Sequence, residues 1–541
     1  MDHLSVRLPR AALGSLALVG TLVLSSCAAG SDGPDAGSDS MPKTLRLAIG
    51  GENEEGYDPT LGWGRYGSPL FQSTLLVRNP DLSIGTDLAT AYEVSPDGLV
   101  WTVDIRTDAA FSDGEPVTAA DVAYTFTTAS QQGGLTDVTA LASAEAVDED
   151  TVELTLKRPQ STFVNRLVSL GIVPEHAHDE NYAQNPIGSG PFTLVEWTKG
   201  QQLVVERNDD YYGQRPAFER LTFVFTDEDA SLAAAKTGEV DLVGVPASLA
   251  TQEIDGMRLE AVTSIENRGI SFPTVPDTGE TSPAGYPIGN DVTASTAIRR
   301  AVNVAVDRQE LVDGVLEGFG SPATGPVDNS PWFNPASAIE DADVDAASQI
   351  LAQDGWEDSD GDGTVEKDGL DAAFTLLYPA GDSLRQGLAL SVVDQLAPAG
   401  IKVSTEGVGW EEIYTRQHQD AVLFGWGSHD PYEMYSLYHS SMAGVESYNP
   451  GYYDNPVVDD HLDAALRATT PEEATEHWKA AQLDADGVGF SGGADAAWAW
   501  LVNLDHTYFV SECLDLGELQ IEPHGHGWPI TAGITGWTWS C

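Results

Sequence analysis

Short stretches of alternating hydrophobic and polar residues predict β-strands in the first part of the chain. Residues 45–49 (LRLAI) and 100–105 (VWTVDI) follow this pattern, in which successive side chains point to opposite faces of a sheet. Thr118 and Asp121 have the spacing of a capping box, and the apolar residues after them predict a helix. Short strands and helices are expected to alternate through Leu249.

The second part of the chain has helical periodicity, followed by a strand–helix–strand pattern. Apolar residues at i+3 and i+4 spacing predict one helix over 295–316 and another over 344–351. Strand-like residues 373–378, a helix over 383–396 and strand-like residues 401–404 then form a βαβ-type unit, which indicates a mainly parallel sheet. The predicted fold class is α/β, in more than one lobe.

The first 27 residues have the pattern of a secretory signal. Arg7 and Arg10 precede an apolar run over residues 11–24, which is shorter than the ~20 apolar residues that span a bilayer. The run ends in Leu-Ser-Ser-Cys, with Cys27 last, and this resembles the lipobox of bacterial lipoproteins. The resemblance implies that residues 1–26 are a signal peptide and that Cys27 carries lipid.

Residues 27–43 are rich in Gly, Ser and Asp and predict a flexible tether. No later segment approaches ~20 consecutive apolar residues, so the lipid is expected to be the membrane anchor. These features predict a protein held on the extracytoplasmic face of the cell membrane.

The charge of the chain excludes one class of partner. Its 541 residues include 84 Asp+Glu and 26 Lys+Arg, for a formal net charge of −58. Such a surface repels phosphate backbones, so nucleic acid is not expected as a partner. The 41% hydrophobic content and 13 Trp predict a packed globular protein rather than a disordered acidic chain.

Several segments carry a more specific signal, and they follow one another in a fixed order. The longest are 88–106 (LATAYEVSPDGLVWTVDIR) and 111–122 (FSDGEPVTAADV). The others are 187–192 (IGSGPF), 206–212 (ERNDDYY), 235–241 (AKTGEVD), 297–308 (AIRRAVNVAVDR) and 318–326 (GFGSPATGP). Together they resemble family 5 extracellular solute-binding proteins, which are the peptide- and nickel-type receptors of ABC importers.

This resemblance implies a two-lobe, periplasmic-binding-protein-like fold in which ligand is enclosed between the lobes by hinge motion. The first lobe is expected over 44–272 with a C-terminal return at 506–541, and the second lobe over 273–505. The expected partners are the permease and ATPase subunits of an importer. No catalytic activity is expected.

The segment 424–435 (FGWGSHDPYEMY) resembles the family's cleft segment. There an acidic residue can pair with the amino terminus of a peptide, which makes Asp430 the first candidate ligand residue, with Trp426 beside it. The alternative is that Asp430 caps the turn before Pro431. His429 is the second candidate, either as a metal ligand or as a hydrogen-bond partner of the ligand.

Three further residues are candidates for the cleft. Tyr57 lies in the first loop, which faces the cleft in family members. Arg268 lies near the expected lobe crossing, where it could hold a carboxylate bidentately or pair with one of the many acids. Trp410 is a weaker candidate.

The remaining candidates concern disulfides and metals. Cys513 and Cys541 can pair in an oxidising compartment. Asp358, Asp360 and Asp362 match the first half of an EF-hand-type calcium loop, but Gly369 stands where a bidentate Glu is expected. The loop therefore predicts either a structural calcium ion or an Asx-rich turn. No other cofactor is expected.

The sequence thus predicts a lipid-anchored receptor that captures short peptides and delivers them to an ABC permease. The alternative is a receptor for nickel or another metal held as a small-molecule chelate. This alternative rests on His429 and on the histidines of the segment 524–526 (HGH).

Overall fold

The computed structural model describes residues 43–53, 55–66, 70–132, 136–525 and 528–541. The predicted signal peptide, Cys27 and almost all of the predicted tether lie outside these residues. Within the described ranges, no helix is both long enough and apolar enough to cross a membrane.

A mixed sheet of eleven strands runs through the chain. Ten of them follow one path, with β13 (Gly320–Pro322) paired to β19. In order across the sheet, the ten are β17 (Lys402–Val408), β16 (Ala373–Pro379), β18 (Ala421–Trp426), β12 (Met257–Ser271), β19 (Trp498–Ser511), β11 (Leu242–Val245), β1 (Thr44–Ala48), β10 (Arg220–Val224), β9 (Gln202–Arg207) and β8 (Phe192–Thr198).

The expectation of a mainly parallel sheet is wrong. The βαβ-type unit does pair β16 with β17 in parallel, and β1 is parallel to both of its neighbours. The hairpin of β8 and β9 and the long pair of β12 and β19 are antiparallel, because each is joined by a turn or by a chain that reverses direction.

The two longest strands, β12 and β19, cross the middle of the sheet. They pair from Met257 opposite Ser511 to Ser271 opposite Trp498, with a shift of register between Thr263 and Asn267. At this shift the C-terminal segment replaces β19 as a partner, since Ile265 N donates to Glu522 O at 2.9 Å. The crossing strands and the end of the chain therefore meet at one point.

The first lobe combines one end of the large sheet with a smaller antiparallel sheet and short helices. The smaller sheet has the order β4 (Ala89–Val94), β5 (Val100–Ile105), β7 (Thr151–Leu156) and β6 (Leu141–Ala146). The other elements are β2 (Leu76–Arg78), β3 (Ile84–Thr86), α1 (Ala119–Gln132), α2 (Val164–Ser169), α3 (Glu228–Thr237), α4 (Ala247–Ala250), β20 (Leu514–Asp515) and β21 (Thr538–Trp539).

The helix α1 begins as the sequence predicts. Thr118 N donates to Asp121 Oδ2 at 2.9 Å, and Asp121 N donates to Thr118 Oγ1 at 3.4 Å. These reciprocal bonds satisfy free donors at the start of the helix.

The second lobe packs helices around the other end of the large sheet. They are α5 (Thr296–Ala305), α6 (Arg308–Gly314), α7 (Val344–Gln353), α8 (Ser383–Leu396), α9 (Trp410–Arg416), α10 (Tyr432–Tyr438), α11 (Pro456–Arg467) and α12 (Pro471–Gln482). A small hairpin, β14 (Glu366–Lys367) with β15 (Leu370–Asp371), follows α7. The strands and helix predicted over 373–404 are confirmed.

The single helix predicted over 295–316 is wrong, because the chain forms α5 and α6 with a break at Val306 and Asp307. Asp307 caps α6 by accepting a hydrogen bond from Glu310 N, and its own N–H donates to Gln395 Oε1. Gln395 lies on α8, so a contact distant in sequence fixes the break.

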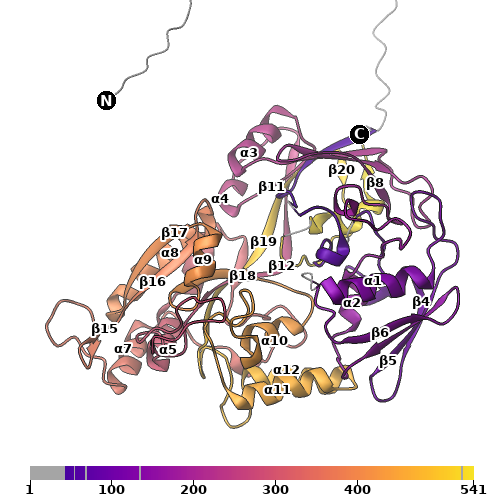
Figure 1. The fold of residues 1–541 in the computed structure, drawn as a ribbon. Helices are drawn as coiled ribbons and strands as arrows, with labels where there is room; N and C mark the ends of the chain where they lie inside the picture. Colours follow the sequence, from indigo (N-terminus) through magenta and orange to yellow (C-terminus); the bar gives the residue numbers. More distant parts are fainter. Residues whose placement is uncertain (1–42, 54, 67–69, 133–135, 526–527) are drawn as a thin grey trace, which may run out of the picture. The chain divides into compact units, whose positions relative to one another are not determined.

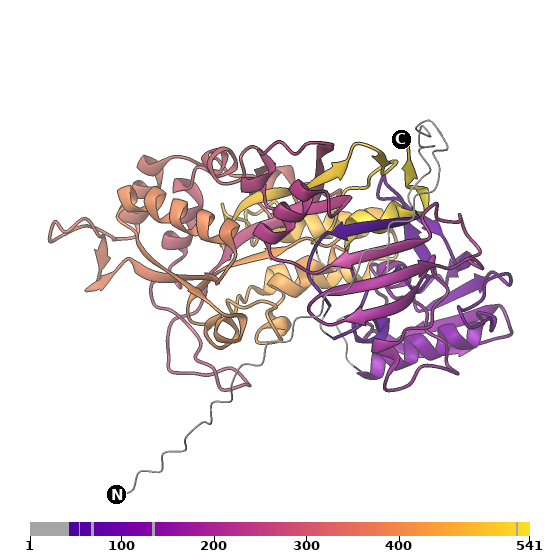
Figure 2. The same cartoon turned by 90° about the horizontal axis from the view of Figure 1, so that it is seen from above.

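Separate hydrophobic cores lie in the two lobes. One core of the first lobe combines residues of β1, β9 and β10 with residues 508–537 of the C-terminal return, and one core of the second lobe combines α5, α6, α8 and β16. Figure 1 shows α1, α2 and the small sheet on one side of the β12–β19 pair, with α5, α7 and α8 on the other side, and Figure 2 shows the same separation from above. The α/β two-lobe fold is confirmed, while the predicted residue boundaries of the lobes stay predictions.

Candidate ligand-binding cleft

Two adjoining cavities, of about 290 and 370 Å³, are lined by residues of both lobes. We call the first the arginine cavity and the second the acidic cavity, after the side chains described below. The cavities share the lining residues Arg65, Tyr66, Arg166, Ser169, Ser428 and Asp430. Because they share a wall, they form the two sides of a single cleft.

Three of the chain's 26 Lys+Arg side chains line the arginine cavity. Arg65 belongs to the first loop, Arg78 ends β2 and Arg166 lies on α2. Two carboxyl groups, Asp87 and Asp430, and the imidazole of His429 also line this cavity. In so acidic a chain, a cavity with more arginines than carboxylates is suited to an anionic group.

In the acidic cavity, carboxyl groups outnumber arginines. Its carboxyl groups are Asp137, Asp430, Glu433 and Glu446, against the shared Arg65 and Arg166. Its aromatic lining residues are Tyr66, Trp426, Tyr432 and Tyr448. Carboxylates among aromatic faces suit an ammonium group.

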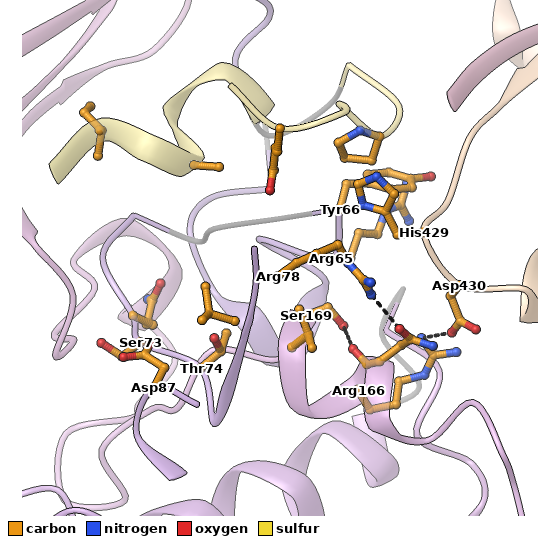
Figure 3. A pocket seen from close by; sticks show the side chains of 18 of the residues that line it. Arg65, Tyr66, Ser73, Thr74, Arg78, Asp87, Arg166, Ser169, His429 and Asp430 are labelled. Carbon is orange, nitrogen blue, oxygen red and sulfur yellow. Dashed lines mark hydrogen bonds and ion pairs between the residues drawn. The ribbon is translucent and has the colours of Figure 1, made fainter. Parts of the chain in front are cut away.

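An ion pair between the lobes divides the two cavities. Arg166 Nη1 of α2 lies 2.9 Å from Asp430 Oδ2, in the loop between β18 and α10, and both side chains are buried (Figure 3). Burial raises the pKa of Asp430, and Arg166 opposes that shift. Asp430 Oδ1 also accepts a hydrogen bond from Tyr432 N at 3.0 Å, so the predicted turn cap is present.

Among the described residues, four buried polar atoms on the cleft walls have neither a hydrogen-bond partner nor an ion pair. They are Gln72 Oε1 and His429 Nε2 in the arginine cavity, and Thr136 Oγ1 and Trp426 Nε1 in the acidic cavity. Buried polar atoms are normally paired, so such atoms on a cavity wall indicate where ligand or ordered water binds.

His429 is neutral at physiological pH. Burial, together with the nearby Arg78, lowers the pKa of its imidazole to about 3. A hydrogen bond to the backbone of Ile521 engages the ring, and since Nε2 has no partner, Nδ1 is the nitrogen that makes it. Nε2 then carries a free lone pair toward the cavity.

Glu433, at the start of α10, is the most strongly perturbed carboxyl group of the acidic cavity. Burial raises its pKa to about 8, although the Gly427 and Ser428 N–H groups donate hydrogen bonds to it. Glu433 is therefore mostly protonated at neutral pH and does not act as a fixed negative charge. Asp137 is ionised, since Thr139 and Arg166 outweigh its burial and lower its pKa.

A second set of buried charges lies behind the cleft, where β12, β19 and the C-terminal segment meet. We call Glu266, Arg268, His506, Glu522 and His524 the crossing cluster. Glu266 Oε1 lies 2.6 Å from Arg268 Nη1, and its Oε2 lies 2.9 Å from His506 Nε2. His506 Nδ1 lies 2.6 Å from Glu522 Oε2.

Opposite charges set the ionisation of this cluster. Burial alone would raise the pKa of Glu266, but His524, Arg268 and His506 hold it well below its ordinary value. Burial would likewise lower the pKa of His506, but its two carboxylate partners raise it to about 9. Gly427 allows this close packing, because a side chain there would place its Cβ 2.6 Å from Glu266 Cα.

The structure brings three of the six predicted ligand residues to the cleft. Asp430 lines both cavities, His429 lines the arginine cavity and Trp426 lines the acidic cavity. Their role in binding stays a prediction.

The other three predicted residues lie elsewhere. Tyr57 is completely buried in the first lobe, where its ring packs edge-on against Trp63. Arg268 pairs with Glu266 in the crossing cluster, so the acid-pairing alternative describes its position. Trp410 is exposed on α9 and stacks on Tyr414.

The three arginines of the cleft, Arg65, Arg78 and Arg166, were not predicted from the sequence. Arg65 lies in the first loop, eight positions after Tyr57, and the expectation that this loop faces the cleft is the signal that could have found it. Arg78 and Arg166 gave none, because they are 88 positions apart in the chain and meet only in the folded protein.

The cysteines and the acidic loop lie away from the cleft. Cys513 and Cys541 are each disulfide-bonded, and Ser540 N donates to Cys513 O at 2.8 Å. Their pairing with each other stays a prediction. Carboxylate oxygens of Asp358, Asp360 and Asp362 lie within 4.8 Å of one another, and Asp360 Oδ1 accepts from Asp362 N, as in an Asx turn. Calcium binding there stays a prediction.

Of the two histidines in the segment 524–526, only His524 belongs to the residues that the structure describes. His524 belongs to the crossing cluster, with its Nε2 3.5 Å from Glu266 Oε1, and His526 lies outside the described residues. His524 also stacks on Tyr66 of the cleft wall, with ring centroids 5.5 Å apart.

Comparisons with known proteins agree with this architecture. Residues 83–446 match the model of bacterial extracellular solute-binding proteins, family 5. The chain is 35% identical over 517 residues to Protein XP55 of Streptomyces lividans, covering 92% of this chain and 90% of that one. It is 29% identical over 420 residues to the oligopeptide-binding protein AppA of Bacillus subtilis, covering 72% and 74%.

A solved structure with a similar fold is NikZ of Campylobacter jejuni in complex with Ni(L-His). It has a TM-score of 0.79 at 23% identity and covers 92% of this chain and 100% of its own. The family match, the relatives and the two-lobe fold with its cleft lead to one conclusion. This chain belongs to the bacterial extracellular solute-binding proteins, family 5.

Proposed function

We propose that this protein is the extracytoplasmic receptor of an ABC importer and that it captures short peptides for the permease. The observation that carries the proposal is the cleft itself, which has a cationic side and an acidic, aromatic side within one enclosed space. A peptide with free termini carries both charges. The name of the Bacillus subtilis relative, an oligopeptide-binding protein, supports the same ligand class.

The receptor binds its ligand without chemical conversion. Asp430 pairs with Arg166, Glu433 accepts hydrogen bonds from backbone N–H groups, and Asp137 accepts from Thr139. Peptide recovered from the protein is expected to be intact.

Lipid at Cys27 holds the receptor at the membrane. The Leu-Ser-Ser-Cys motif after an apolar run supports this part of the proposal. Cys27→Ser is expected to move the protein from the membrane fraction to the soluble fraction of its host. Retention of the variant in the membrane fraction would contradict lipid anchoring.

Native mass spectrometry of the full chain, purified without denaturation, tests the ligand class. Release of a distribution of peptide masses is the expected result. A single small mass with the isotope pattern of a metal would contradict it.

The second candidate function is uptake of a metal as a small-molecule chelate. One specific observation favours it: the buried Nε2 of neutral His429 faces the arginine cavity without a partner, and a neutral imidazole is a common metal ligand. Arginines near it could hold the carboxylates of a chelator. The same mass measurement separates the two functions.

A further inference from the structure

The arginine cavity is not confined to the space between the lobes. Among its described lining residues, Ser428, His429 and Asp430 belong to the second lobe and the others to the first. Figure 3 shows Asp87 at the end of the cavity away from His429 and Asp430. The cavity therefore begins in the cleft and continues as a channel into the first lobe.

The walls of this channel come from separate parts of the first lobe. One wall is formed by residues within 72–78 and by α2, and the other by residues of the C-terminal return. Neutral polar side chains are frequent along both walls, namely Ser73, Thr74, Ser169, Gln520 and Thr535. Hydroxyl and amide groups can donate and accept hydrogen bonds, which suits the backbone of an extended peptide.

Gln72 provides an open hydrogen-bonding position inside the channel. The residue is 2% exposed, and its Nε2 donates to Tyr57 O and to Tyr182 Oη, each at 3.1 Å. Tyr182 Oη itself donates to Ile187 O, so it accepts from Gln72. Gln72 Oε1 has no hydrogen-bond partner among the described residues. Such an oxygen on a cavity wall marks a place for an N–H group of a ligand or for a water.

The channel ends beside a second pocket, which lies at the surface of the first lobe. This pocket has a volume of about 620 Å³, and it shares Asp87 and Tyr211 with the arginine cavity. Several of its other lining residues are exposed: Thr86, Thr90, Thr107 and Asp108. Because the two hollows share lining residues, the channel leads from the cleft toward solvent.

Packed side chains frame this outer end. Tyr212 Oη donates to Asp87 Oδ1 at 2.6 Å, and the rings of Tyr211 and Tyr212 have centroids 4.7 Å apart. The guanidinium of Arg106 lies 4.1 Å from the centre of the Tyr212 ring. Gly213 leaves room for Tyr211, because a Cβ there would lie 2.6 Å from Tyr211 Cε1. These contacts fix the position of the two residues that the hollows share.

We propose that the channel binds the part of a longer peptide that the cleft does not hold, with the end of that peptide at the surface pocket. Cavities of about 290 and 370 Å³ are of the size that encloses a drug-sized ligand. Eight extended residues reach about 26 Å, at ~3.3 Å per residue. This inference rests on the proposed function and adds to it the acceptance of peptides of different lengths.

The test compares tripeptides and octapeptides with randomised side chains. Each mixture is offered to the full chain after ligand release, and bound peptide is measured by native mass spectrometry. The wild type is expected to bind both lengths. Val77→Trp in β2 and Ala532→Trp in the 3-10 helix η6 (Pro529–Gly536) narrow the channel from its two walls. Each is expected to lower octapeptide binding about ten-fold and to leave tripeptide binding unchanged.

The chain offers a matched control for these variants. Val77 and Ala532 are both exposed, so a larger side chain at either position does not enter a hydrophobic core. Ala352 is an exposed residue of α7 that lines neither hollow, and Ala352→Trp is expected to behave as the wild type. Circular dichroism establishes that each variant is folded.

A wild type that binds tripeptides but not octapeptides would overturn the inference and leave the proposed function standing. Unchanged octapeptide binding in both folded channel variants would also overturn it, as would an equal loss of tripeptides and octapeptides. If neither mixture binds to the wild type, the proposed function and the inference both fall.

Discussion

Glu266 in the crossing cluster is buried and Arg78 in the arginine cavity is partly buried, and the partners of the two charged groups differ. Glu266 contacts Arg268, His506 and the Gly525 N–H, which compensate its charge within the protein. Arg78 donates hydrogen bonds to two neutral oxygens, and the nearby Asp430 only partly opposes the fall in its pKa that burial causes. The comparison teaches that a charge with close ionic partners joins strands and loops, whereas a charge on a cavity wall that bonds only neutral oxygens stays available for other partners.

The crossing cluster also connects separate parts of the chain. Its members come from β12, β19 and the C-terminal segment, and His524 stacks on Tyr66 of the cleft wall. Loss of one member therefore affects the point where the two lobes meet.

The largest expected effect comes from breaking this cluster. Glu266→Gln leaves Arg268 and His506 without their buried partner, and we expect the free energy of unfolding to fall by about 3–5 kcal/mol. Urea unfolding followed by Trp fluorescence measures it. Glu260→Gln is the matched control on β12, because its pair with Arg258 is one-third exposed, and it should cost less than about 1 kcal/mol. Equal losses in the two variants would contradict the comparison.

The pH dependence of stability reports on His506. Its folded pKa of about 9 lies above the ordinary histidine value of 6.5, so its contribution to stability is complete below pH 6.5 and is lost as the pH rises through 9. The loss is on the order of 3 kcal/mol, at 1.36 kcal/mol per pKa unit. His506→Gln should flatten this part of the profile. An unchanged slope in the variant would assign the effect to other groups.

The Arg166–Asp430 pair provides an intermediate case, because its two opposite charges compensate each other although the pair lies in the cleft. Arg166→Gln is expected to cost about 1–3 kcal/mol, which is less than Glu266→Gln, because Asp430 with its raised pKa can take up a proton. The double variant Arg166→Gln with Asp430→Asn should recover part of this loss. A double variant less stable than Arg166→Gln alone would show that the pair's charge is not the cause.

Local elements could be predicted from the sequence because their causes are local. The capping box of α1 lies within four residues, and the βαβ-type unit of β16, α8 and β17 has its own periodicity. The break between α5 and α6 was missed because it depends on Gln395, 88 positions after Asp307.

The candidate site also has a part that could be predicted from the sequence and a part that could not. Trp426, His429 and Asp430 share one segment, so a single motif indicated all three. Whether an arginine is compensated depends on which acids the fold brings near it, and this separates Arg268, paired with Glu266, from Arg78. Residue type and spacing do not contain that information.

Unfolding of the ligand-free protein tests the central claim most directly, with Arg78→Gln and Arg268→Gln measured side by side. We predict that Arg268→Gln lowers the free energy of unfolding by about 3–5 kcal/mol, because Glu266 loses a buried partner. Arg78→Gln should change it by less than about 1 kcal/mol, because only bonds to neutral oxygens are lost. A loss in Arg78→Gln as large as that in Arg268→Gln would make Arg78 a structural residue and contradict the account.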